Sequence, residues 1–148
     1  MVRIEDHRLI TGKGKFTANI RPTEALVVKF LRSPIACGVI RSIDIRDAKS
    51  MPGVVNIFTA QDMAADGVTH MLDTAKPVRD DGGTVINPRR PILNSSDIKH
   101  LGEPIAIIIA QTSEQADNAL EAIFVDYSDS DSALLSSENT DSPLVWPE

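Results

Sequence analysis

The segment His100–Tyr127, HLGEPIAIIIAQTSEQADNALEAIFVDY, contains three predicted secondary-structure elements in close succession. Residues 105–110 (IAIIIA) form an unbroken apolar run rich in β-branched side chains, which is typical of a strand buried on both faces. Residues 124–127 (FVDY) return to an extended pattern. A helical pattern lies between them, so this segment predicts a strand–helix–strand unit near the C-terminus.

The predicted helix of this unit begins after Thr112. The Thr112 side chain can accept a hydrogen bond from a free backbone N–H group, and Gln115 can bond back to complete a capping box. Four apolar side chains recur at helical spacing and form one face: Ala116, Ala119, Leu120 and Ile123. Because two of them are alanines, we expect the helix to lie close to a sheet.

Three further strands are predicted upstream, at residues 25–31, 39–45 and 54–58. In the first of them, Val28 and Phe30 share one face while Lys29 lies on the other. Short helical segments are predicted at residues 47–51 and after Thr59, which can cap the second of them. The order of elements predicts an α+β fold with a mixed sheet.

The domain organisation follows from two changes in composition. Periodicity is lost between residues 64 and 90, where glycine, proline and charged residues predict a long loop of a functional or disordered kind. After Tyr127 the chain is rich in Ser and Asp. We expect one domain at residues 1–128 and a linker or tail at 129–148. Trp146 in this tail is expected to dock either on this domain or on a partner.

Composition excludes several classes of protein. The chain has 148 residues, is 42% hydrophobic and carries a net charge of −6, which argues against nucleic-acid binding. The single cysteine, Cys37, excludes an internal disulfide, a four-cysteine zinc site and an iron–sulfur cluster held by this chain alone. No segment approaches the roughly 20 apolar residues of a membrane helix. A cytoplasmic protein with no membrane partner is expected.

A search for catalytic chemistry assigns no catalytic, cofactor-binding or metal-binding residue. The sequence has no GxSxG motif and no GxGxxG motif after a strand, and GKGKF at residues 12–16 has the spacing of a simple turn. His70 and Asp73 lack a third metal-ligand partner. Glu103, between Gly102 and Pro104, is the most suggestive acid. Its carboxylate either faces a cleft or belongs to a turn with its side chain in water.

Several short motifs occur in a characteristic order along the chain. They are RIED at 3–6, LITGKGKF at 9–16, FLRSP at 30–34, IRSID at 40–44, MPGVV at 51–55, GEPIA at 102–106 and VDY at 125–127. In this order they resemble the N-terminal α/β-hammerhead domain of the large, molybdopterin-binding subunit of the xanthine dehydrogenase/aldehyde oxidase family. Two segments depart from the family pattern, IACG at 35–38 and SDSDS at 128–132.

The resemblance implies a place in a molybdenum hydroxylase, an oxidoreductase that oxidises an aldehyde or N-heterocycle with oxygen taken from water. In this family other domains or subunits hold molybdopterin, the iron–sulfur clusters and the flavin (FAD), so none is expected to bind this chain. The expected partner is the catalytic molybdopterin-binding domain or subunit. By the same resemblance, Met71 and Leu72 are candidates for a substrate-access loop, unless both only cover the domain's own core. The candidate interface residues are Gly102, Glu103, Pro104 and Trp146.

Two hypotheses of different classes follow. In the first, the chain is a non-catalytic structural domain or small subunit of a molybdenum hydroxylase, inactive when isolated, that packs against the cofactor-binding domains and shapes substrate access. In the second, it is a stand-alone binding or assembly module that retains the hammerhead fold. A large exposed apolar patch would favour the first hypothesis, and a polar surface would favour the second.

Overall fold

The computed structural model describes residues 3–17, 20, 22–68, 70–71, 78, 80–83 and 88–131. The helices are α1 (Asp6–Ile10), α2 (Arg46–Lys49), α3 (Ala60–Ala65) and α4 (Ser113–Ala122). The strands are β1 (Val27–Arg32), β2 (Gly38–Asp44), β3 (Val54–Thr59), β4 (Asp97–Ile98), β5 (Pro104–Ala110) and β6 (Phe124–Asp129). The predicted strand–helix–strand unit is therefore present as β5, α4 and β6.

The strands form two three-stranded sheets, with the orders β1-β5-β3 and β4-β2-β6. Their pairings in the described part of the chain are antiparallel. The α+β class is confirmed, although the strands form two antiparallel sheets where we expected a mixed sheet. The physical reason is that β1 and β3 occupy both edges of β5, so β6 cannot pair beside it and joins β2 instead.

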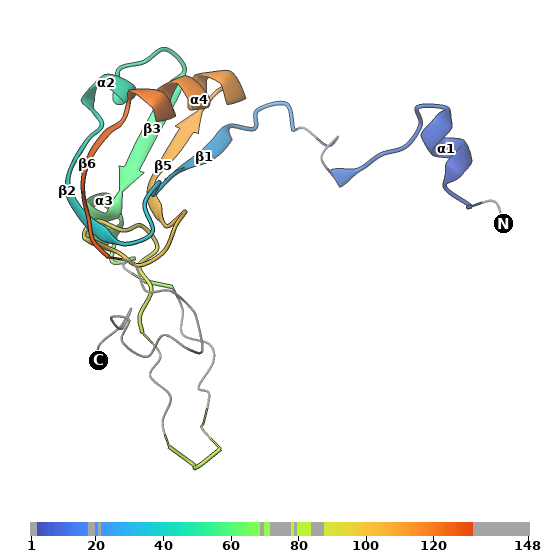
Figure 1. Ribbon diagram of the computed structural model, residues 1–148. Helices are drawn as coiled ribbons and strands as arrows, with labels where there is room; N and C mark the ends of the chain where they lie inside the picture. Colours follow the sequence, from blue (N-terminus) through green and yellow to red (C-terminus); the bar gives the residue numbers. More distant parts are fainter. Residues whose placement is uncertain are drawn as a thin grey trace.

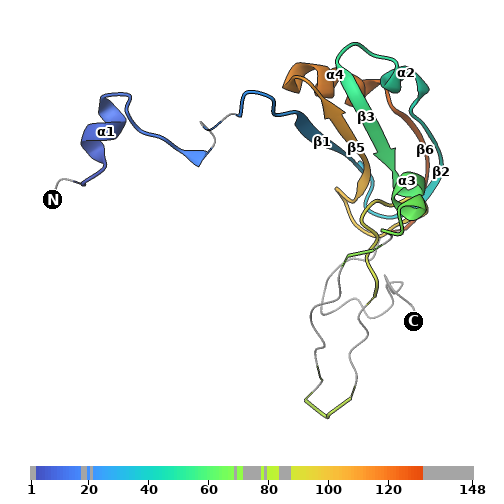
Figure 2. The same cartoon turned by 180° about the vertical axis from the view of Figure 1, so that it is seen from behind.

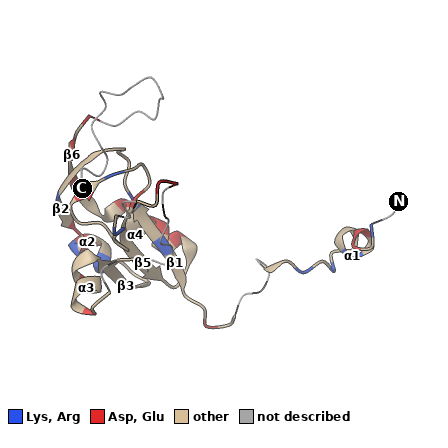
Figure 3. Cartoon of the chain, turned by 90° about the horizontal axis from the view of Figure 1, so that it is seen from below, with Lys and Arg blue, Asp and Glu red and all other residues tan. Residues whose placement is uncertain are grey.

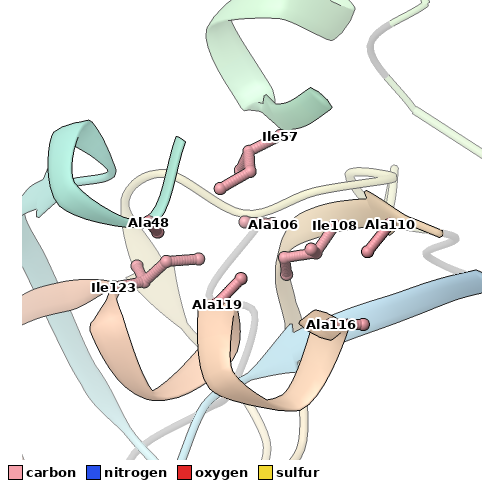
Figure 4. Close-up of a cluster of buried hydrophobic side chains, with 8 residues drawn as sticks. All are labelled: Ala48, Ile57, Ala106, Ile108, Ala110, Ala116, Ala119 and Ile123. Atoms are coloured by element: carbon pink, nitrogen blue, oxygen red, sulfur yellow. The ribbon is translucent and has the colours of Figure 1, made fainter. Parts of the chain in front are cut away.

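Helix α4 covers one face of the β1-β5-β3 sheet, and the main hydrophobic core lies between them (Figure 4). Ala116 and Ala119 on the helix are fully buried, as is Ile108 on β5. The predicted apolar face and the predicted capping box of α4 are both confirmed: Thr112 Oγ1 accepts a hydrogen bond from the Gln115 N–H (3.2 Å), and Gln115 Oε1 accepts one from the Thr112 N–H (3.1 Å). Small helix residues thus allow the close approach that the sequence predicts.

A second buried cluster joins the two sheets. It consists of Ile40 on β2, Ile98 on β4 and Ile105 on β5. Ile43 and Val125, which are partly buried, pack against this cluster and against the main core as well. The two sheets and α4 therefore share a continuous apolar interior, although each cluster is small.

The N-terminal segment leaves this body from the beginning of β1 and extends away from it, with α1 at its far end (Figures 1 and 2). No residue of α1 is buried. The sequence predicts only a turn in this region and gives no sign of α1, because a helix of five residues is too short to show a periodic pattern. Gly12, with φ +68°, follows the end of this helix.

Candidate functional site

The Gly102-Glu103-Pro104 segment forms a turn that is hydrogen-bonded to the end of β1. The Gly102 N–H donates to the Ser33 carbonyl (2.9 Å), and the Ser33 N–H donates to the Glu103 carbonyl (2.8 Å). Gly102 has φ +80°, a left-handed conformation that favours glycine. Arg32 Nη1 also donates to the Gly102 carbonyl (2.9 Å). The motif therefore fixes the entry into β5.

The Glu103 side chain is directed inward. Glu103 is only 5% exposed, and its Oε2 accepts a hydrogen bond from the Lys99 N–H (2.8 Å). The Nδ1 atom of His100 lies 3.8 Å from the same oxygen. The interpretation of Glu103 as a turn residue with its side chain in water is wrong, because the carboxylate closes the turn that begins at Lys99. Its role at an interface stays a prediction.

Met71 lies at the base of the long loop. Its N–H donates to the Arg90 carbonyl (2.8 Å), and a β-bridge joins His70 to Pro91. Met71 is 60% exposed and belongs to neither buried cluster of the described residues. Leu72 and Trp146, the other candidates for the loop and the interface, lie outside the described residues. Substrate access through this loop stays a prediction.

A cleft of about 310 Å³ lies between β2 and the beginning of α3. Two charged side chains line it, Arg41 and Asp62. Arg41 Nη2 donates to Ser128 Oγ (3.0 Å), while Asp62 Oδ2 accepts from both the N–H and the hydroxyl of Thr59 (2.7 Å each). These hydrogen bonds, the backbone bond first, lower the pKa of Asp62. Asp62 is thus held ionised as part of the α3 capping box.

The cleft between β2 and α3 does not fit a bound molybdopterin. The two charged side chains of the cleft have opposite signs and bond to neighbouring residues, so the cleft lacks the clustered donors that a phosphate group requires. In the same part of the chain, no three His, Cys, Asp or Glu side chains are placed to hold a metal ion. The low pKa of Asp44, about 2, comes from hydrogen bonds with Arg46 at the surface.

The most extensive candidate surface is the face of the β1-β5-β3 sheet that is turned away from α4. We call it the open face. Because directly paired residues of antiparallel strands share a face, the register places six residues on it. They are Val28 and Phe30 of β1, Ile107 and Ile109 of β5, and Asn56 and Phe58 of β3. Five of the six are apolar, and neither β3 nor β5 carries a charged residue (Figure 3).

The open face is uncovered in the described structure. Val28 is 52% exposed and Phe30 is 42% exposed, while Phe58, Ile107 and Ile109 are half-buried. None of these five packs against either buried cluster of the described residues. The face is therefore a continuous apolar surface on an otherwise well-packed domain.

The open face is continuous with the turn that the sequence singles out. The Arg32 guanidinium lies 5.5 Å from the centre of the Phe30 ring, in cation–π geometry, and also bonds to the Gly102 carbonyl. The neighbouring residue of that turn, Leu101, is 67% exposed. The candidate interface at Gly102–Pro104 therefore borders a larger apolar surface.

Sequence reasoning missed the open face as a site, although the signal is present. The run at residues 105–110 predicts burial on both faces, and Lys29 alternates with Val28 and Phe30. In the structure Lys29 lies on the covered side, where its ammonium pairs with Asp117 of α4, and the apolar pair lies on the uncovered side. A test of which face α4 leaves bare would have identified the site.

Comparison with known proteins agrees with this architecture. The family model for the aldehyde oxidase and xanthine dehydrogenase a/b hammerhead domain matches residues 11–131. The chain therefore belongs to this family of hammerhead domains, which confirms the resemblance noted in the sequence. The match covers both sheets and α4.

Individual relatives are large subunits of oxidoreductases. The chain is 29% identical over 121 residues to the nicotine 6-hydroxylase large subunit of Paenarthrobacter nicotinovorans, covering 82% of this chain and 14% of the relative. It is 31% identical over 123 residues to the carbon monoxide dehydrogenase large chain of Hydrogenophaga pseudoflava, covering 83% and 14%. The crystal structure of quinoline 2-oxidoreductase from Pseudomonas putida 86 superposes with a TM-score of 0.76 at 29% identity, covering 90% and 16%.

The chain thus spans about one seventh of the length of the curated relatives that it matches. One relative is named a xanthine dehydrogenase molybdenum-binding subunit, in Escherichia coli O157:H7. The matched region is one domain of these large subunits. None of the described helices is long and apolar enough to cross a membrane.

Proposed function

We propose that this chain is a non-catalytic structural domain or small subunit of a molybdenum hydroxylase. It packs against the cofactor-binding domains, which carry the oxidation of an aldehyde or N-heterocycle with oxygen from water. Molybdopterin, iron–sulfur clusters and FAD belong to those other parts of the complex. Met71 and Leu72, in the long loop, contribute to the path by which substrate enters.

The observation that carries this proposal is the mismatch between family membership and length. Residues 11–131 match the hammerhead family, yet the chain covers only 14% of relatives such as the nicotine 6-hydroxylase large subunit. The described residues also do not converge on a cofactor site, because Glu103 and Asp62 are both used in local hydrogen bonds. A supporting role for this domain agrees with both facts.

The open face favours this role over the alternative of a stand-alone binding or assembly module. A module that works alone would be expected to expose a polar surface, whereas five of the six residues on the open face are apolar. An enzyme component that is covered by a partner has no such constraint. The apolar surface therefore supports a subunit or domain in a larger assembly.

The test is to express the full 148-residue chain with an affinity tag in its source organism, grown with molybdate. We expect the purified chain to bring down a molybdopterin protein and close to one molybdenum atom per chain, measured by elemental mass spectrometry and pterin fluorescence. An untagged strain serves as the control. Recovery of the chain without molybdenum or any molybdopterin protein would contradict the proposal.

A second measurement addresses the non-catalytic part of the proposal. The isolated chain, freed from its partner by purification from a heterologous host, is assayed with aldehydes and purines and an artificial electron acceptor. We expect no turnover above buffer. Sustained oxidation by the isolated chain would show that catalytic groups reside in it.

A further inference from the structure

We infer that the open face is the surface on which the cofactor-binding part of the molybdenum hydroxylase docks. This inference rests on the proposed function and makes it specific, because it names the face, the side chains and the character of the partner. The partner presents an apolar surface to Val28, Phe30, Phe58, Ile107 and Ile109. Leu101 and Arg32 lie at the border of the contact.

The first argument is the direction of alternation in β1. A sheet with one solvated face normally places polar residues on that face and apolar residues on the face that packs on the core. Here Lys29 is on the covered side, where it pairs with Asp117, and Val28 and Phe30 are on the bare side. In a free domain this alternation would expose the apolar residues of β1 and cover its lysine. It becomes favourable when a second layer covers the bare side of the sheet.

The second argument is the composition of β5. Its run IAIIIA at 105–110 is apolar on both faces, as in strands that are buried between two layers. The isolated domain buries Ala106, Ile108 and Ala110 completely but leaves Ile107 and Ile109 half-buried. A strand of this composition in the centre of a sheet implies a second covering layer that the described residues do not supply.

The third argument concerns the size of the partner. The open face supplies six residues, whereas a stable interface needs roughly 20–30 residues a side. The segment at residues 3–26 leads directly into β1, which is an edge strand of the same sheet, and its apolar side chains include Ile4 (98% exposed) and Ile10 (82% exposed). Together, the extended segment and the open face can contact a partner surface larger than the open face alone.

This requirement selects the partner. The relatives have about six-sevenths of their length beyond the matched region, so in those proteins a much larger neighbour adjoins this domain. The cofactor-binding remainder of such an enzyme is large enough to contact the open face and the extended segment simultaneously. It meets this surface whether it belongs to the same polypeptide or to another.

The test compares two phenylalanines in the tagged 148-residue chain. Phe30 lies on the open face (42% exposed), and Phe124 lies on β6 in the other sheet (66% exposed). Phe30→Glu replaces an apolar ring with a carboxylate that would lose its water at the interface, even beside Arg32, so we expect about tenfold or greater loss of molybdenum recovered per chain. Phe124→Glu is the matched control and should recover molybdenum as the original chain does.

Two further measurements fix the interpretation. The thermal transition of isolated Phe30→Glu should stay close to that of the original chain, because Phe30 is outside both buried clusters. Side-chain footprinting should show Phe30, Ile107 and Ile109 labelled in the isolated chain and protected in the molybdenum-containing complex. If both variants lose the partner, this protection decides the question.

Four results would overturn the inference. Full molybdenum recovery by Phe30→Glu, or equal labelling of Phe30 in the free and bound chain, would place the contact on another face while leaving the proposed function intact. Dimerisation of the isolated chain that Phe30→Glu abolishes would make a second copy the occupant. Absence of molybdenum from the original chain would remove the proposed function together with this partner.

Discussion

The two faces of the β1-β5-β3 sheet are built from the same three strands but end in different states. On the covered face, Ile108 and Ala110 are fully buried beneath the alanines of α4. On the open face, Ile107 and Ile109 of the same strand are half-buried and have no covering helix in the described structure. The composition of β5 therefore suits a strand covered on both faces, although the described domain covers only one of them.

The difference indicates that one face of the sheet stabilises the fold and the other face binds a partner. The covered face uses small helix residues, Ala116 and Ala119, so that α4 lies close to the sheet and few gaps remain. The open face uses larger side chains such as Phe30 and Phe58, which present area to another surface. Substitutions on the covered face should change folding, and substitutions on the open face should change binding.

The largest effect is expected from truncating Ile108 on the covered face. Ile108→Ala removes a fully buried side chain and leaves a cavity under α4, so the free energy of unfolding of the isolated chain should fall by about 3 kcal/mol. Ile109→Ala is the matched control, one residue along the same strand on the open face. It should cost about 1 kcal/mol, because Ile109 is only partly buried and belongs to neither buried cluster.

Urea denaturation followed by circular dichroism measures both values in the isolated chain. For recovery of the molybdenum-containing partner, the two variants should rank the other way. Per folded chain, Ile109→Ala should recover less molybdenum than Ile108→Ala. Equal destabilisation of the isolated chain by the two variants would remove the distinction between the faces.

A smaller effect is expected at Gly53, where the turn between α2 and β3 approaches the first turn of α4. Gly53 has φ +80°, and a Cβ atom there would lie 2.1–2.2 Å from the side-chain end of Gln115. That amide is held in the capping box with Thr112, so it cannot move without losing its hydrogen bond. Gly53→Ala should cost about 2 kcal/mol, from backbone strain and the broken cap together.

Two controls separate these causes. Gly67→Ala imposes a similar φ, +75°, with no atom within 4 Å of the new methyl group, and should cost about 1 kcal/mol from strain alone. In a Gln115→Ala background the excess cost of Gly53→Ala should vanish. Persistence of the full cost in that background, measured by the same denaturation experiment, would show that the crowding is not with Gln115.

The local elements of the fold could be predicted because their signals are local. Thr112 and Gln115 are three residues apart, and the alanine face of α4 repeats within one helix, so capping and burial follow from short spacings. The division into two sheets could not be predicted in this way. It depends on β1 and β3 both pairing with β5, which are contacts between segments distant in the chain.

The candidate site shows the same limit. The motif Gly102-Glu103-Pro104 is visible in the sequence, but the direction of the Glu103 carboxylate depends on the Lys99 N–H that the folded turn brings to it. The alternation of Val28, Lys29 and Phe30 is also visible. Which side α4 covers is a tertiary fact, because it depends on how the helix packs on the sheet; in the structure Asp117 of α4 pairs with Lys29 on that side.

The smallest effect is expected at the cap of α4. Thr112→Ala removes the oxygen that accepts from the Gln115 N–H, and should lower the free energy of unfolding by about 1 kcal/mol. Thr112→Ser keeps that oxygen and should retain most of the stability. Calorimetry should show a fall in Tm of roughly 2–4 °C for the alanine variant, given a domain of this size.

The Thr112→Ala variant also separates the contribution of the covered face to folding from the contribution of the open face to binding. Thr112 lies at the end of the helix on the covered side, so its loss weakens folding without altering a side chain of the open face. Below its Tm, Thr112→Ala should therefore recover as much molybdenum per folded chain as the original protein, whereas Phe30→Glu should not. Loss of the partner by Thr112→Ala at a temperature where the chain is fully folded would mean that α4 itself, and not the opposite side of the sheet, contacts the enzyme.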